Sequence, residues 1–256
     1  MAGIRVLRVR ITGLTASFRI PHVMIGRLPT FKMPPPATIY GFLAGALGIW
    51  FELNGLQFAY TFTYNGIAED LELAHIVERA GGSFWKGGPP KNLQGNTNPQ
   101  RREFLLHPSM TLYLAGNDDL VNQLAVAIRR PQFAALLGRS QDLATCREVA
   151  FTELEPAREG FISHTILPWS LRQWVLPGTP VFMPKTISDS YREPVFERYI
   201  EIGHRPVNVY NGSPDVTNVD SFGLFYIDRS EHYTNSMRTL YRAVIFHKLE
   251  REGVPV

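Results

Sequence analysis

Aromatic and basic residues occur together in one short stretch of this 256-residue sequence, residues 83 to 91, which read SFWKGGPPK. The stretch places Phe84, Trp85, Lys86 and Lys91 among glycines and prolines. Proteins hold single-stranded nucleic acid with cationic side chains near the phosphates and aromatic side chains that stack on the bases. The composition therefore indicates an RNA-binding loop or extended mobile hairpin over residues 81–100. An ordinary exposed loop, whose aromatic side chains pack back on the body, is the alternative.

Histidines and the single cysteine are the other residues that could do chemistry. Acid-base cleavage of RNA needs a histidine, or a lysine with a tyrosine, at the scissile phosphate. His107 follows the basic pair Arg101 and Arg102 and is the best-placed candidate, although a lone histidine in a strand is more often an ordinary surface or core residue.

The seven histidines never have the close spacing that zinc ligands have on a helix, and Cys146 has no second thiol. The sequence also contains no glycine-rich motif for a nucleotide. We therefore expect no metal and no cofactor.

Charged residues fall into three blocks of alternating sign. Residues 1–51 contain basic residues and no acidic residue, residues 52–78 contain acidic residues and no lysine or arginine, and residues 79–102 are again basic. This segregation predicts one basic surface that faces a polyanion and one acidic surface. Chance segregation over sheet faces and loops is the alternative.

Export and membrane insertion are both disfavoured. The first segment, MAGIRVLRVRITG, has arginines where a signal peptide needs an unbroken apolar run, and one cysteine excludes an intramolecular disulfide. In the apolar run at residues 33–51 the prolines leave only about 15 helical residues, short of the roughly 20 that span a membrane. We expect a cytoplasmic protein without a membrane partner.

Two elements position the basic residues of the first block. The segment IRVLRVRIT alternates apolar residues with Arg8 and Arg10, which predicts a half-buried strand. The segment KMPPPATIYGFLAGALG, residues 32–48, predicts a helix that begins at Pro35 or Pro36, because proline is tolerated in the first turn. The free amide groups of that first turn would form an anion site. The glycines of the helix indicate close approach to a neighbour, most simply a sheet.

The remaining elements complete an α+β pattern. Asn65-Gly66 predicts a hairpin between the strands on either side of it, and residues 101–114 resume strand character. Residues 118–137 predict a helix that Pro131 bends or splits, with Asn117 or Asp118 as its cap. A strand follows at residues 144–154. The order strand, helix, strand, strand, helix, strand is ferredoxin-like, an arrangement that many RNA-binding modules share.

We expect this ferredoxin-like domain to occupy residues 1–155. A smaller β-rich lobe is expected over residues 156–256, in which SFGLFYID and LYRAVIFHKL are the clearest strands.

Three segments, MPPPATIYGFLAGALG, RREFLLHPSMTLYL and LGRSQDL, in this order and spacing resemble the Cas-five family of the RAMP superfamily, most closely its type I-B members. That family supplies the subunit that caps the foot of the type I CRISPR surveillance complex, Cascade, an antiviral ribonucleoprotein. The resemblance implies a ferredoxin-like RAMP fold with a protruding thumb, here about residues 79–102. It also implies a subunit that grips the five-prime handle of the CRISPR RNA.

The implied partners are the Cas-seven backbone subunit, the large subunit of Cas-eight type and, through the complex, target DNA. The resemblance places handle contacts at the helix start (Pro36, Ala37, Thr38, Tyr40) and at the Gly-Arg-Ser turn (Gly138, Arg139, Ser140). The expected RNA-binding set also includes the cationic side chains of the first block and the residues of the thumb, namely Arg8, Arg10, Arg19, Lys32, Phe84, Trp85, Lys86, Lys91, Arg101 and Arg102.

One branch of the family, in type I-C systems, is itself the endoribonuclease that matures the CRISPR RNA, with a tyrosine, a lysine and a histidine. Where that tyrosine would lie this chain reads GALGIW, and its only adjacent histidine and lysine are His247 and Lys248. These departures favour a non-catalytic subunit. A metal-independent endoribonuclease is the alternative, and a structural protein that binds a partner through residues 52–78 is a third.

Overall fold

The computed structural model describes residues 3–23, 26–53, 55–83, 85–88, 90–173, 175, 177–187, 193–210, 225–234 and 238–248, without the side chains of 76–83 and 90–96. Two α-helices and many strands make up this part of the chain, so the expected mixed, sheet-rich fold is confirmed. Its elements are β1 (Ile4–Gly13), β2 (Thr15–Ala16), β3 (Phe18–Arg19), β4 (Arg27–Leu28), β5 (Thr30–Phe31), α1 (Pro36–Leu47), β6 (Gln57–Thr63), β7 (Gly66–Ser83), β8 (Pro90–Leu106), β9 (Ser109–Ala115), α2 (Asp118–Arg129), β10 (Ala144–Ala157), β11 (Glu159–Ile162), β12 (Thr165–Pro168), the 3₁₀ helix η1 (Trp169–Leu171), β13 (Thr179–Ile187), β14 (Pro194–Ile202), β15 (Val207–Tyr210), β16 (Phe225–Thr234), β17 (Thr239–Val244) and β18 (His247–Lys248).

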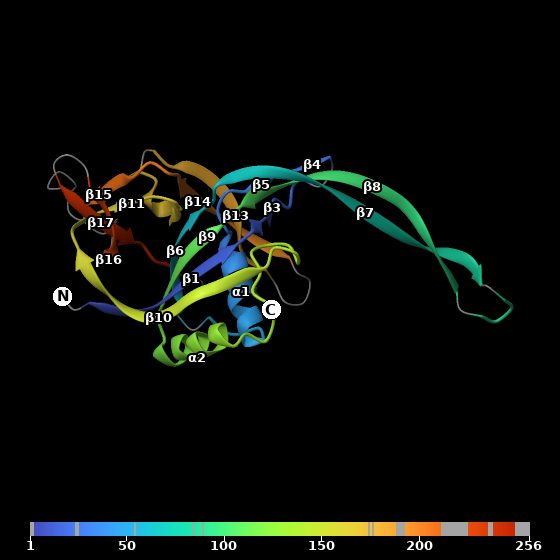
Figure 1. The fold of residues 1–256 in the computed structure, drawn as a ribbon, viewed down its shortest axis with the longest axis horizontal. Helices are drawn as coiled ribbons and strands as arrows, with labels where there is room; N and C mark the ends of the chain where they lie inside the picture. The colour runs from blue at the N-terminus through green and yellow to red at the C-terminus, as the bar shows by residue number, and fades with distance from the viewer. Residues whose placement is uncertain are drawn as a thin grey trace.

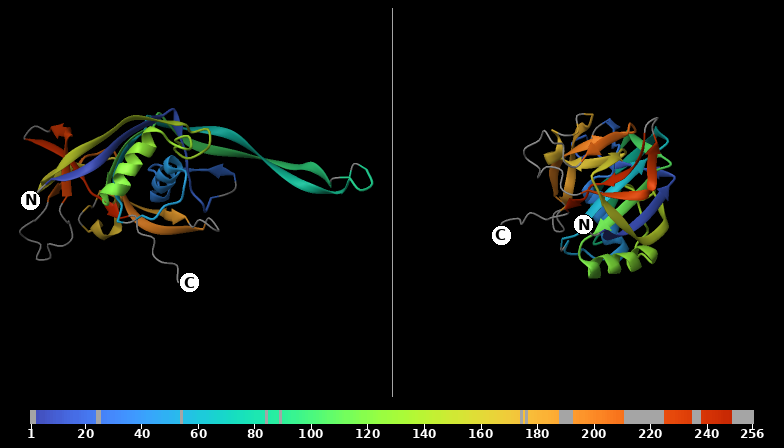
Figure 2. Two further views of the ribbon diagram at one scale, coloured as in Figure 1. Left: turned by 90° about the horizontal axis from the view of Figure 1, so that it is seen from below. Right: turned by 90° about the vertical axis from the view of Figure 1, so that its left-hand side faces the viewer.

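The main sheet has the strand order β15-β11-β17-β16-β10-β1-β9-β6-β18. Its centre, β10-β1-β9-β6, is antiparallel throughout. The chain visits β1, α1, β6, β9, α2 and β10 in this order, with the hairpin of β7 and β8 inserted between β6 and β9. Figure 2 shows α1 and α2 side by side on one face of this sheet.

Side chains of β1 alternate between the two faces of the sheet, as its sequence predicts. Leu7, Val9 and Ile11 are fully buried in the cluster that includes the apolar side chains of α1 and α2. Arg8 and Arg10 alternate with them along the strand. The predicted strand is therefore confirmed, and its arginines lie on the face away from the helices.

Local signals set both helices. Pro35 is the N-cap of α1, and Gly48, with a φ of 79°, ends the helix in the left-handed conformation that glycine adopts without strain. The side chain of Asn117 caps α2 by accepting a hydrogen bond from the backbone N–H of Leu120. The second helix ends at Arg129, ahead of Pro131, so the expected continuation to residue 137 is wrong. In the described part of the chain neither helix is long and apolar enough to cross a membrane.

The strands β7 and β8 form a long hairpin that projects from the body (Figure 1). This hairpin occupies residues 66–106, whereas the sequence placed an arm at about 79–102. The expected pairing across Asn65-Gly66 is wrong, because β6 pairs with β9 while β7 pairs with β8. The N–H of Asn65 donates to the carbonyl of Leu106 at 2.9 Å, so Asn65 lies at the base of the arm.

The acidic and basic blocks of the sequence lie side by side. Acidic residues of β7 face basic residues of β8 across the hairpin, as in the register pair Asp70 with Arg102. The side chain of Glu72 accepts a hydrogen bond from Nε of Arg102 at 2.6 Å. Opposite charges on adjacent strands stabilise a sheet, so strand pairing accounts for much of the segregation. The expectation of separate acidic and basic surfaces is wrong for this pair of strands.

Residues beyond 157 extend the main sheet and build a second one. β16 pairs with the end of β10, and β18 closes the opposite edge against β6. A three-stranded sheet, β12-β14-β13, packs beside α1 through β13. The late strands were expected from their sequences, but the division into two units at residue 155 stays a prediction, and β10 runs continuously through that position.

Candidate nucleic-acid interface

An open cleft of about 1160 Å³ lies between α1, the base of the hairpin and the loop that follows α2. Three other pockets are smaller, with volumes of about 10, 10 and 530 Å³. The cleft is lined by Ser17, Phe18, Arg19, Pro21, Pro35, Ala37, Thr38, Gly41, Phe42, Gly45, Glu72, Leu73, Arg102, Phe133, Ala134, Ala135, Leu136, Gly138, Arg139, Gln141, Pro184, Ile187 and Pro194.

The glycines of α1 face this cleft. A Cβ added at Gly41 or at Gly45 would meet nothing within 4 Å. The prediction that these glycines allow close packing against the sheet is therefore wrong, and the helix packs into the core through residues such as Ile39 and Leu43. Each glycine in a helix interior costs about 0.5–1 kcal/mol relative to alanine. The fold accepts this cost at a surface where a ligand can approach the backbone closely.

The first turn of α1 offers fewer free amide groups than its sequence indicated. Pro35 and Pro36 have no N–H, and the amides of Thr38 and Ile39 donate to the Pro35 carbonyl at 2.8 and 3.3 Å. Of the amides in this turn, that of Ala37 does not donate to the Pro35 carbonyl. The contribution of the helix start is therefore mainly one of shape, with the small side chains of Ala37 and Thr38 on the wall of the cleft.

Tyr40 does not lie in the cleft. Its side chain is only 3% exposed, and its hydroxyl donates to the Phe51 carbonyl at 2.9 Å and accepts from the Phe51 N–H at 3.2 Å. Its ring also packs beside Trp50. The prediction of an RNA contact at Tyr40 conflicts with this burial, because the residue fixes the end of the helix against the following loop. Pro36 is buried as well.

The Gly138 turn is held against the β2–β3 segment. Gly138 has a φ of 118°, and a Cβ there would lie 2.0 Å from the carbonyl oxygen of Ser17. Only glycine fits this approach. The N–H of Ser17 donates to the Leu137 carbonyl at 3.2 Å, and Ser140 next to the turn is exposed. The turn lies at the cleft, where its contact with RNA stays a prediction, while the glycine itself serves the fold.

An ion-pair network crosses the floor between this turn and the hairpin. The Arg139 guanidinium donates to both oxygens of Asp142 at 3.0 Å and to Glu72 at 2.8 Å. Asp142 is fully buried and also accepts from the Thr15 hydroxyl at 2.6 Å. With Arg102 bound to the other oxygen of Glu72, two arginines face two carboxylates.

These contacts also change the pKa of Glu72. Burial alone would raise the pKa of this carboxyl, but hydrogen bonds from Arg102 and Arg139 outweigh burial and hold the pKa below its usual value. Burial alone would lower the pKa of Arg139, but the hydrogen bonds to Asp142 and Glu72 outweigh burial. The pKa of Arg139 is therefore raised. The network is therefore charged but neutral overall, and it fixes the hairpin to the body more than it attracts phosphate.

Basic side chains outside this ion-pair network remain at the rim. Arg19 lines the cleft and is exposed. Lys32 and Arg101 are also exposed, and each is close in the sequence to residues that line the cleft. Within the described part of the chain none of the three is within ion-pair distance of a carboxylate. Of the expected basic contacts, Arg19 thus combines position in the cleft with a charge that no neighbour neutralises.

Arg8 and Arg10 lie on the other face of the sheet and do not line the cleft. Nη2 of Arg8 is 2.9 Å from Glu148, Nη1 is 3.3 Å from Asp228, and the side chain is only 14% exposed. Nε of Arg10 is 3.4 Å from Glu148. These carboxylates compete with a phosphate for both arginines, which lie away from the cleft, and the prediction that Arg8 and Arg10 contact RNA stays a prediction.

The hairpin projects away from the body (Figure 1), and the residues of its tip do not line the cleft. Trp85 is 64% exposed and Lys86 is exposed, in the turn between β7 and β8. Phe84 and the side chain of Lys91 lie outside the described residues. The aromatic and basic character of the tip therefore belongs to the projecting arm, separate from the cleft at its base.

Neither candidate histidine joins the cleft. His107 is exposed in the turn between β8 and β9, with a φ of 48°. His247 is buried against the ring of Phe58, its Nε2 lies 2.9 Å from the Ile166 carbonyl oxygen, and burial lowers its pKa to about 4. An imidazole in such a site has no access to an RNA phosphate.

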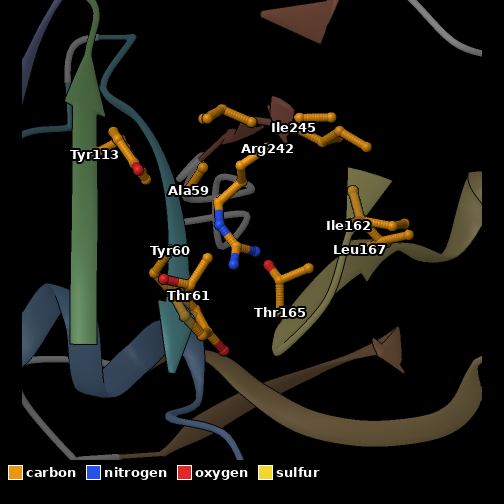
Figure 3. A pocket seen from close by; sticks show the side chains of 11 residues that line it. Ala59, Tyr60, Thr61, Tyr113, Ile162, Thr165, Leu167, Arg242 and Ile245 are labelled. Atoms are coloured by element: carbon orange, nitrogen blue, oxygen red, sulfur yellow. The ribbon is translucent and has the colours of Figure 1, made fainter. Parts of the chain in front are cut away.

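A second, enclosed pocket lies between β6, β12 and β17 (Figure 3). Its volume of about 10 Å³ holds roughly one water molecule. The guanidinium of Arg242 points into it toward Thr61 and Thr165, and its Nη1 donates to the Ser163 carbonyl at 3.1 Å. The pocket is too small for a ligand.

The cleft brings together four segments that the sequence assigned to RNA: the residues around Arg19, the start of α1, the basic end of the hairpin and the Gly-Arg-Ser turn. Sequence reasoning missed its remaining walls, which are Phe133 and the β13–β14 residues Pro184, Ile187 and Pro194. Phe133 is 64% exposed, and nothing in the sequence around it predicts that exposure. The prolines belong to strands whose contact with α1 depends on tertiary packing alone.

Comparisons with known proteins give one family. Residues 6–208 match the model of the family described as "CRISPR-associated protein (Cas_Cas5)". Among solved structures, a chain of a "CRISPR RNA-guided surveillance complex" is similar with a TM-score of 0.52 and 18% identity, over 82% of this chain and 91% of that chain. The "Crystal structure of a CRISPR protein from Archaeoglobus fulgidus" has a TM-score of 0.44 and 10% identity, over 93% and 99% of the two chains. No curated protein sequence matches this chain.

Proposed function

This chain belongs to the CRISPR-associated Cas_Cas5 family, and we propose that it is a non-catalytic subunit of a type I CRISPR surveillance complex. In this proposal the subunit binds the five-prime handle of the CRISPR RNA and acts in the cytoplasm. It caps the Cas-seven backbone and contacts the large subunit of Cas-eight type, and through the complex it takes part in recognition of target DNA. We also propose that this complex is of type I-B.

The observation that carries the proposal is the meeting of separate segments at one cleft. Residues near 19, 37, 102 and 139 are far apart in the sequence, and all line the same open volume of about 1160 Å³. The cleft has a cation at Arg19 and open space beside the Cα atoms of Gly41 and Gly45, where a Cβ would meet nothing within 4 Å. A single strand of RNA fits such a site, because its backbone needs a cationic contact and close approach to small residues.

The fold agrees with this role. The order β10-β1-β9-β6, with α1 after β1 and α2 after β9, supports a ferredoxin-like assignment. The hairpin of β7 and β8 would be the thumb of the family, with Trp85 and Lys86 at its tip. The network of Glu72, Arg102 and Arg139 fixes the base of this thumb to the cleft, so that RNA in the cleft and a base beside the thumb are held by one rigid unit.

Charge reversal at the rim of the cleft tests RNA binding. Arg19→Glu should weaken the affinity of the purified chain for labelled handle RNA. It should also reduce the salt dependence of binding by about 0.7 units of slope for each RNA phosphate that the protein no longer neutralises. Arg158→Glu, in the exposed turn between β10 and β11, is the matched control. Equal affinities and equal salt slopes for the two variants would reject the proposal.

The non-catalytic part of the proposal has its own test. Labelled repeat RNA incubated with the chain in a chelator should remain intact, because neither His107 nor His247 lies at the cleft. Specific cleavage that His107→Ala abolishes would instead establish a metal-independent endoribonuclease.

A further inference from the structure

A second aromatic surface lies outside the cleft, on the three-stranded sheet. Phe182 of β13 and Phe196 of β14 stack with ring centroids 5.0 Å apart, and the ring of His22 lies 4.9 Å from that of Phe196. Phe182 is 51% exposed, and His22 is exposed as well. Phe196 is half-buried, and Phe182 and His22 on either side of it extend the group of rings to the surface of the protein.

Arginines continue this stack toward η1. Arg198 is the cross-strand partner of Phe182, and its guanidinium carbon lies 5.8 Å from the centre of the Trp169 ring. The guanidinium carbon of Arg172 lies 5.4 Å from the same ring. Both arginines are exposed, and in the described part of the chain neither is within ion-pair distance of a carboxylate. We name the aromatic strip after its members, which are His22, Phe196, Phe182, Arg198, Trp169 and Arg172.

The aromatic strip begins at the rim of the cleft. Pro21 lines the cleft and directly precedes His22, and Pro194 lines it two residues before Phe196. A strand of RNA that leaves the cleft on this side therefore meets the ring of His22 first.

The chemistry of the aromatic strip favours single-stranded nucleic acid over a protein partner. Exposed aromatic faces stack on any base, and this stacking needs no particular sequence. Arginines beside the rings, with no carboxylate within ion-pair distance in the described part of the chain, attract a polyanion, and an apolar protein surface would have to bury their charges without an opposite charge. Rings and guanidinium groups that alternate along one surface suit a chain in which bases and phosphates alternate.

We propose that the aromatic strip is a second RNA-binding surface, on which bases stack after the RNA strand leaves the cleft. This inference rests on the proposed function, because the RNA reaches the strip from the cleft. It assigns to β13, β14 and η1 a direct contact with the guide RNA, in addition to the cleft and the thumb.

Two series of labelled RNAs test this inference, each lengthened one nucleotide at a time from one end of the handle. Phe182→Ala should leave the affinity unchanged for RNAs that fill only the cleft. Above a threshold length in one of the two series it should weaken the affinity roughly tenfold. Phe182→Trp keeps an aromatic face and should retain the wild-type affinity at every length. Val126→Ala, at an apolar position of α2 that is 65% exposed, is the matched control and should change neither series.

Arg19→Glu separates this inference from the proposed function. That variant should weaken the binding of RNAs of every length, and no effect would reject RNA binding in the cleft. A length-dependent loss with Phe182→Ala, together with weaker binding of Arg19→Glu, supports the inference. A length-dependent loss without any effect of Arg19→Glu would show that RNA binds the strip and would reject its passage through the cleft. If Arg19→Glu weakens binding while Phe182→Ala leaves the affinity unchanged at every length in both series, the strip does not bind RNA. A surface for a protein subunit would give that result, and the inference would be overturned.

Discussion

The glycines of α1 give a prediction in which stability and RNA binding change in opposite directions. Gly41→Ala and Gly45→Ala add a methyl group that meets nothing within 4 Å. Each substitution should therefore stabilise the helix by about 1 kcal/mol, the usual difference between glycine and alanine in a helix interior. The double variant should gain about 2 kcal/mol in the free energy of unfolding.

Urea unfolding measures this gain. The midpoint should rise at an unchanged m-value, because the surface exposed on unfolding stays nearly the same. The melting temperature should rise by roughly 4–8 °C for a chain of this size. A loss of stability would refute the reasoning, since it would mean that the helix packs closely against another part of the protein at these glycines.

RNA affinity provides the second half of the prediction. Gly45→Leu places a large side chain in the cleft and should weaken handle RNA binding roughly tenfold, the cost of overfilling a packed interface. Gly203→Ala is the matched control, because Gly203 also has open space around it and lies outside the cleft. An affinity of Gly45→Leu equal to that of this control would show that RNA does not approach α1.

Three further predictions concern the fold that supports the site. Burial holds the pKa of His247 at about 4, below its ordinary 6.5, so the unfolded chain binds the extra proton between these values. The free energy of unfolding should therefore fall by roughly 3 kcal/mol as the pH falls from about 7 to about 4, and urea titrations of His247→Phe should lack this component. Gly138→Ala should lower the urea midpoint by the equivalent of roughly 2–3 kcal/mol, because its Cβ would collide with the Ser17 carbonyl; an unchanged midpoint would contradict the close approach. Arg139→Ala should cost roughly 3 kcal/mol, since it leaves the Asp142 carboxylate buried without its partner, and Asp142→Asn in the same chain should recover part of that loss in a double-mutant cycle.

Elements with a strong local signal were predictable from the sequence. The alternation around Val9 gave β1, the prolines before residue 37 gave the start of α1, and Asn117 gave the cap of α2. Each of these signals depends on residues within a few positions of one another. Local periodicity and capping chemistry therefore carried the prediction without any knowledge of the fold.

Features that depend on distant partners were not predictable. The hairpin begins at residue 66 because β6 pairs with β9, and these two strands are separated in the sequence by the whole of the hairpin. Tyr40 lies beside predicted contacts in the sequence, yet helix periodicity turns it into the core. The charge of Arg8 is neutralised by Asp228, which belongs to a strand near the other end of the chain. The sequence located the segments of the candidate site, and tertiary contacts decided which of their side chains face the cleft.

Photocrosslinking tests most directly whether the cleft binds CRISPR RNA. The purified chain would be irradiated with handle RNA that carries a photoreactive nucleotide at successive positions, and the crosslinked peptides would be identified by mass spectrometry. RNA in the cleft should crosslink to peptides that contain residues 17–21, 37–45 and 133–141, which line it. Crosslinks confined to other surfaces, such as the face of the sheet that carries Arg8, would contradict the account.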